Sequence, residues 1–98
     1  MKNKIMSLSE KYYEKVKEIR HLIHMYPELG FEEYKTSELI INELEKLGIE
    51  VQRNVAKTGV VGLIRGKQEG KTVLLRADMD ALRVEEKVDV GYKSKIPG

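Results

Sequence analysis

A short apolar run that ends in two aspartates constrains the fold of this chain more than any other feature. The segment from Thr72 to Leu82 reads T-V-L-L-R-A-D-M-D-A-L, and its apolar start is typical of a buried β-strand. Asp78 and Asp80 follow, and side chains two apart on a strand point to the same face. In open α/β sheets, ligands bind outside the carboxyl ends of the strands. The run therefore predicts an α/β fold with a candidate site for a metal, a phosphoryl group or a positively charged intermediate at this strand end.

Length and composition limit the chain to one domain with a modest core. A chain of 98 residues buries roughly 60 to 65 per cent of its unfolded surface. Hydrophobic residues make up 41% and charged residues 35%, which excludes low-complexity disorder, and no apolar run approaches the roughly 18 residues of a membrane-spanning helix. The 18 basic and 16 acidic residues are scattered, without the basic stripe of nucleic-acid binders. We therefore expect neither a membrane nor nucleic acid as a partner.

Neither thiol chemistry nor secretion is indicated. The chain has no cysteine, so it can form no disulfide and offers no thiolate as a nucleophile or metal ligand. Its first residues lack the continuous apolar core and the small-residue cleavage site of a signal peptide. We therefore expect a cytoplasmic protein.

The first predicted element is a helix over residues 8–25. Apolar side chains recur there at steps of three and four, which is one helical face. Ser7 and Glu10 fit the capping-box pattern at a helix start. Pro27 is expected to end the helix, because proline disfavours a helical conformation in the residue before it.

A second helix and about three strands are predicted after it. The 3.6-residue period runs from about residue 32 to 47, with acids at its start that suit the helix dipole, and Gly48 reads as its C-terminal cap. The pattern then alternates over 49–55, as in a half-buried strand, and apolar runs at 60–66 and 72–77 predict two more strands that pair as a hairpin. Residues after 84 are expected to form an extended loop.

Two helices cover only one face of such a sheet. The V-L-L run of residues 73–75 is nevertheless of the kind expected in a strand buried on both faces. The second face must then be covered by elements outside this chain or by a second copy of it. A non-catalytic, self-associating α/β module with a homo-oligomer contact through this face is therefore one hypothesis.

The aspartate pair alone leaves three interpretations open. Aspartates at strand ends serve as turn formers and helix caps. A D-x-D phosphohydrolase would use Asp78 to attack phosphorus, but Leu82 stands where that motif usually has Thr or Val. A metal site needs further ligands, and the chain offers only His21 and His24. These histidines are better explained as hydrogen-bonding residues near a helix end.

Several sequence blocks in a fixed order carry a more specific signal. With these blocks the chain resembles the N-terminal portion of metal-dependent amidohydrolases of the aminoacylase and carboxypeptidase family, in the branch of hippurate hydrolases, N-acyl-L-amino acid amidohydrolases and auxin-conjugate hydrolases. The blocks are R-H-L-I-H-M-Y-P-E-L-G-F-E-E at 20–33, T-G-V-V-G at 58–62, L-R-A-D-M-D-A-L at 75–82, E-E at 85–86 and Y-K-S-K-I-P-G at 92–98.

The resemblance implies that residues 1–98 form the N-terminal part of an α/β/α metallohydrolase catalytic domain, without the family's second domain, which serves dimerisation and substrate closure. Complete members hydrolyse N-acyl amino acids or related amides. One or two divalent ions (zinc, manganese, cobalt or nickel) activate a water in them, and a glutamate takes its proton. In relatives the general base and the cysteine and histidine ligands follow the last of these blocks. The resemblance thus implies no metal ligand within this chain, no bound metal and no hydrolysis by the chain alone.

The resemblance also assigns roles to individual acids. Asp80 matches the aspartate that orients the metal site from behind its ligands, and Asp78 takes the place of a histidine, as an acid at the site's edge. Glu85 and Glu86 match a pair near the substrate cleft without an assigned role, and no substrate-binding residue is identified. Arg83 replaces a proline usual in the family, which alters the loop after Asp80.

Overall fold

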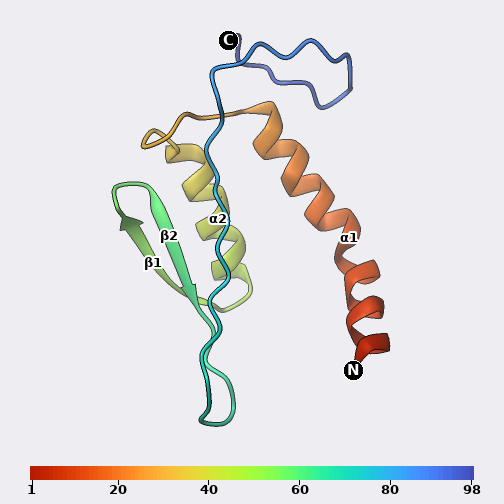
Figure 1. Ribbon diagram of the computed structural model, residues 1–98, viewed down its shortest axis with the longest axis vertical. Helices are drawn as coiled ribbons and strands as arrows, with labels where there is room; N and C mark the ends of the chain where they lie inside the picture. The colour runs from red at the N-terminus through yellow and green to blue at the C-terminus, as the bar shows by residue number, and fades with distance from the viewer. The chain divides into compact units, whose positions relative to one another are not determined.

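The structure is a computed structural model that describes residues 1–98. Its elements, in chain order, are helix α1 (Lys2–Met25), helix α2 (Tyr34–Lys46), strand β1 (Glu50–Val55) and strand β2 (Gly59–Leu63) (Figure 1). They belong to two units: a first unit of residues 1–27 with 84–98, and a second unit of residues 28–83. Each unit is described by itself.

The second unit consists of α2 packed on a two-stranded antiparallel hairpin (Figure 1). In the hairpin Glu50 lies opposite Leu63 and Gln52 opposite Val61, with an irregularity before the turn. The core under α2 is small: Ile41, with 2% of its surface exposed, is the only buried hydrophobic residue of the chain. This unit therefore depends on a few polar contacts as well as on apolar packing.

The end of α2 and the alternation after it confirm the sequence prediction. Gly48 has φ +73°, and its N–H donates to the Glu45 carbonyl at 3.0 Å. Glycine adopts this left-handed conformation without strain, which explains the helix end. Along β1, Val51 and Val55 are half-buried and the residues between them are exposed, as the two-residue period predicts.

The predicted start of the first helix was wrong. Helix α1 begins at Lys2 and has no side-chain cap, so Ser7 and Glu10 lie inside the helix and form no capping box. The residues before Ser7 contain no helix breaker, so nothing in them prevents the helix from extending to the chain start. None of the 24 residues of α1 is buried. Its end at Met25, two residues before Pro27, agrees with the prediction.

The predicted third strand and its hairpin were also wrong. Residues 72–77 form no strand, and β2 pairs with β1 instead. The side chains of Val73, Leu74 and Leu75 are 81%, 85% and 91% exposed. A strand needs a neighbour for its backbone hydrogen bonds, and an apolar run of this type needs a layer on each face. Within this chain the run has neither, so its local pattern alone does not produce a strand.

In the first unit, residues 84–98 fold against the C-terminal end of α1. The Lys95 N–H donates to the Met25 carbonyl at 2.8 Å. The Tyr92 ring stacks on His21 with 3.8 Å between ring centroids. Residues 84–98 contain no helix or strand, which confirms the prediction of a loop there. Neither helix of the chain combines the length and the apolar character needed to cross a bilayer.

Candidate functional site

The two aspartates differ in their surroundings. The Asp78 carboxylate lies 3.1 Å from an Arg76 guanidinium nitrogen, and both side chains are well exposed. Asp80 is exposed and makes no hydrogen bond or ion pair within the chain. Its Oδ2 atom comes within 3.5 Å of the position that a Cβ atom on Gly30 would occupy. Of the two acids, Asp80 is thus the one with a carboxylate free to bind another group.

Backbone contacts hold the loop of Asp80 against residues 28–30. The Ala81 N–H donates to the Glu28 carbonyl at 2.8 Å. Ala81 and Leu29 form an isolated parallel β-bridge. The segment that enters α2 therefore determines where the Asp80 backbone lies.

Glu28 also binds the first turn of α2 through its carboxylate. Its Oε1 atom accepts hydrogen bonds from the Thr36 N–H and the Thr36 hydroxyl, both at 2.7 Å, and Oε2 accepts one from the Lys35 N–H at 3.0 Å. Burial by itself would raise the pKa of the Glu28 carboxyl group. The hydrogen bonds lower it by more than burial raises it, so the pKa lies below its ordinary value. The sequence analysis missed this residue. An acid a few residues before a helix could have indicated it.

A second buried contact joins α2 to the turn between β1 and β2. The Thr58 hydroxyl donates to Glu33 Oε1 at 2.9 Å, and the two residues are 5% and 8% exposed. Glu33 is the N-cap residue of α2. Glu33 therefore stands just before the first turn of α2. The sequence analysis had expected acids within that turn.

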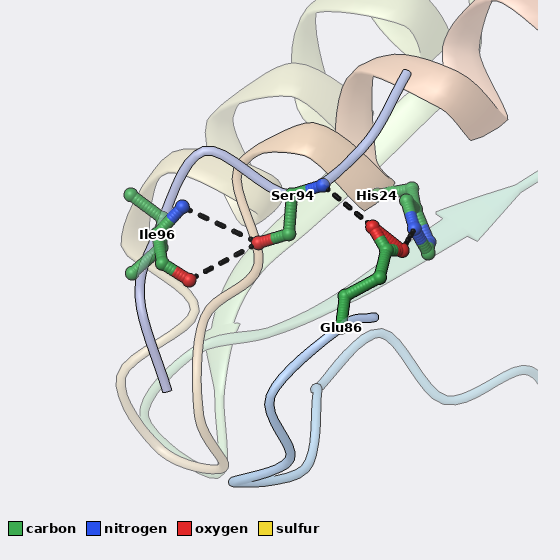
Figure 2. A network of polar contacts seen from close by, with 4 residues as sticks. All are labelled: His24, Glu86, Ser94 and Ile96. Carbon is green, nitrogen blue, oxygen red and sulfur yellow. Dashed lines mark hydrogen bonds and ion pairs between the residues drawn. The ribbon is translucent and has the colours of Figure 1, made fainter. Parts of the chain in front are cut away.

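His24 takes part in a polar network in the first unit (Figure 2). Its Nε2 atom lies 2.6 Å from Glu86 Oε2, and Glu86 Oε1 accepts the Ser94 N–H at 2.8 Å. The Ser94 N–H, followed by His24, lowers the pKa of Glu86. Partial desolvation, followed by the charges of Arg20 and Lys17, lowers the pKa of His21. His24 thus makes the helix-end hydrogen bond that the sequence favoured.

Glu85 also binds backbone, because its Oε2 atom accepts the Gly98 N–H at 2.6 Å. Glu85 and Glu86 together therefore fasten residues 94–98. The sequence analysis had left this pair without a role. In the structure both acids shape the loop.

The residues of this chain do not fit a metal centre by themselves. No group of three or more His, Cys, Asp or Glu side chains gathers where it could hold an ion. The histidines stand in the first unit and the two candidate aspartates in the second. A surface depression on α1 is shallow and apolar and contains none of the candidate site residues; it is lined by Ile5, Leu8, Ser9, Tyr12, Tyr13 and Val16.

Comparisons with known proteins find relatives named as carboxypeptidases, amidohydrolases and amino acid hydrolases. No protein-family model matches the chain. Thermostable carboxypeptidase 1 of Saccharolobus solfataricus is 52% identical over 95% of this chain and 26% of the relative. The hippurate hydrolase of Campylobacter jejuni is 48% identical over 79% of this chain and 20% of the relative. IAA-amino acid hydrolase ILR1-like 5 of Arabidopsis thaliana is 47% identical over 91% of this chain and 20% of the relative.

A solved structure agrees with these relatives. The YxeP protein of Bacillus subtilis, described as a dinuclear metal binding peptidase from the M20 family, matches with a TM-score of 0.84 and 33% identity over 91% of this chain and 25% of that chain. The two helices and the hairpin thus match the N-terminal part of the α/β domain of an M20 peptidase, which confirms the predicted fold class.

The chain is homologous over nearly its whole length to these amidohydrolases and carboxypeptidases, so the resemblance found in the sequence is confirmed. It spans about a quarter of the length of the curated relatives it matches most strongly. These matches do not favour a D-x-D phosphohydrolase or a free-standing self-associating module.

Proposed function

We propose that residues 1–98 supply the N-terminal part of the catalytic domain of a metal-dependent amidohydrolase that cleaves N-acyl amino acids or related amides. The 52% identity to a thermostable carboxypeptidase over 95% of the chain carries this proposal. The substrate is a small-molecule amide, with neither nucleic acid nor a membrane as a partner, and the protein acts in the cytoplasm. The family's second domain, for dimerisation and substrate closure, lies outside these residues.

Asp80 is the residue of this chain that orients the metal site. Its carboxylate is exposed, has no partner within the chain and is fixed through the backbone of Ala81. A carboxylate held in this way can accept a hydrogen bond from a metal-binding side chain and fix its orientation. Asp78 contacts Arg76 and lies at the edge of the site.

The divalent metal of the active protein, which is zinc, manganese, cobalt or nickel, is bound by residues outside this chain. The acids and histidines present here do not gather into a ligand set. The chain alone is therefore expected to show no amide hydrolysis. Its contribution is a scaffold that presents Asp80.

A hybrid enzyme tests this proposal. The matching quarter of the Saccharolobus carboxypeptidase is replaced by this chain, and hydrolysis of hippurate and N-acetyl amino acids is measured with zinc, manganese or cobalt. We expect turnover by the hybrid and none by the 98-residue chain. Asp80→Ala should reduce turnover about 10- to 100-fold, the range found when support of a metal ligand is lost. Asp89→Ala, at an exposed acid outside the site, is the matched control.

Two outcomes would contradict the proposal. A hybrid that folds and binds metal but does not hydrolyse any of these amides would refute the assigned activity. Turnover by the 98-residue chain that survives repurification and disappears in Asp80→Ala would refute the scaffold role.

A further inference from the structure

We propose that Glu28 is a positioning residue that sets the place of Asp80 by joining its loop to the start of α2. This inference deepens the proposed function and depends on Asp80 acting as described above. It arises from two sets of contacts that one residue makes with different parts of the second unit.

The side chain of Glu28 binds the first turn of α2. Both carboxylate oxygens are used, at 2.7 Å to the Thr36 N–H and hydroxyl and at 3.0 Å to the Lys35 N–H. Lys35 and Thr36 are the second and third residues of the helix, whose N–H groups have no acceptor within it. A negative charge at this end also interacts favourably with the helix dipole. The carboxylate therefore fixes the Glu28 backbone relative to α2.

The backbone of Glu28 is hydrogen-bonded to the loop that contains Asp80. Its carbonyl accepts the Ala81 N–H at 2.8 Å, and the adjacent Leu29 forms the parallel bridge to Ala81. Ala81 directly follows Asp80. A rotation of the Glu28 backbone would therefore displace the aspartate.

The turn after Glu28 requires such support. Gly30 lies next to Asp80, with 3.5 Å between the Asp80 Oδ2 atom and the position of an added Cβ atom, which is an ordinary van der Waals contact. Phe31 has φ +65°, a conformation that a bulky residue adopts only when surrounding contacts impose it. The Phe31 side chain is 64% exposed and contributes little packing. The contacts of Glu28 at both ends of the turn hold this strained conformation.

Hydrogen exchange of the 98-residue chain tests the coupling without any need for activity. In Glu28→Ala the amides of Lys35, Thr36 and Ala81 should all exchange about tenfold faster or more, because one change removes the support of both contacts. Glu28→Gln, which retains an acceptor oxygen, should restore part of the protection. Glu32→Ala is the matched control, since Glu32 is an exposed acid of the same segment that makes only backbone hydrogen bonds.

The proposal is overturned if the exchange of Ala81 is unchanged in Glu28→Ala while that of Lys35 and Thr36 accelerates, because Glu28 would then be a helix cap and nothing more. Unprotected Ala81 in the unsubstituted chain would also overturn it. If Glu28→Ala does not fold, the comparison is made with Glu28→Gln and with Thr36→Val, which removes one of the three donors. Faster amide exchange confined to α2 in both of these variants would also overturn the proposal.

The hybrid enzyme supplies the catalytic readout. Glu28→Gln should lower kcat and leave KM unchanged, because a displaced Asp80 weakens the chemistry and not the binding of substrate. Unchanged kcat in a hybrid whose Asp80→Ala variant is impaired would refute the positioning role alone. A hybrid that folds and binds metal but is inactive would refute the proposed function. The coupling of Glu28 to Asp80 would still stand if the protection of Ala81 in the 98-residue chain is lost in Glu28→Ala.

Discussion

His24 and Glu86 lie 62 positions apart in the chain, yet their side chains meet at 2.6 Å between Nε2 and Oε2 (Figure 2). Glu86 also accepts the Ser94 N–H, so one carboxylate joins α1 to two places in the loop of residues 84–98. The contact explains how a segment without helix or strand keeps a defined path.

The protection of Ser94 should therefore depend on pH. The pKa of Glu86 lies below its ordinary value of 4.5, so folding favours the ionised form. The stabilisation is present above the ordinary pKa and is lost as pH falls through the lower, folded-state pKa. We expect Ser94 amide protection to decrease over that acidic range, as measured by hydrogen exchange at a series of pH values.

Glu86→Gln should remove this pH dependence and leave Ser94 weakly protected throughout. Glu85→Gln is the matched control, because Glu85 binds the Gly98 N–H and not Ser94. An equal loss of the pH dependence in both variants would show that the loop opens as a whole and does not depend on Glu86.

Thr58→Val should destabilise the second unit. The Thr58 hydroxyl is the donor to Glu33 Oε1 in a buried contact, and valine keeps the shape while leaving the carboxylate without this donor. We expect a loss of about 1–3 kcal/mol in the free energy of unfolding, measured by urea denaturation. Thr72→Val, at an exposed site, should change it by less than about 0.5 kcal/mol. Equal midpoints for the two variants would show that the contact contributes nothing.

Gly59→Ala should weaken the β1–β2 hairpin. An added Cβ atom would collide with the backbone carbonyl of Val55, which cannot turn away without breaking the pairing of Val55 with Gly59. We expect destabilisation of about 1–3 kcal/mol by urea denaturation. Gly70→Ala is the control, because nothing lies within 4 Å of a Cβ atom there. A Gly59→Ala variant as stable as the control would mean that the turn can relax freely.

Local patterns predicted the elements that depend on local interactions. The end of α1 before Pro27, the Gly48 cap and the alternation in β1 each follow from the conformational preferences of a few neighbouring residues. The contacts of Glu86 join residues brought together only by the fold, and no period or motif records them. Glu28 differs, because an acid a few residues before a helix is a signal that the sequence does contain. The roles of Asp78 and Asp80 stay predictions, because no contact within the chain tests them.

The failed prediction of a strand at residues 72–77 has a physical cause that can itself be tested. Val73 and Leu75 are among the most exposed apolar side chains of the chain, in a run suited to burial on both faces. An exposed apolar run of this kind favours association with other surfaces. In the proposed complete domain, further elements cover it.

The double substitution Val73→Thr with Leu75→Thr should therefore reduce association of the 98-residue chain but destabilise the hybrid enzyme. In the 98-residue chain the pair should reduce the binding of a hydrophobic dye and the size of the scattering species, because it removes exposed apolar surface. In the hybrid enzyme the same pair should lower the stability by about 2 kcal/mol or more, because the side chains are buried there. Lys67→Thr with Lys71→Thr, at exposed positions nearby, is the control. If the apolar pair leaves the hybrid as stable as the control does, the run faces solvent in the complete domain as well, and the prediction that further elements cover it is wrong.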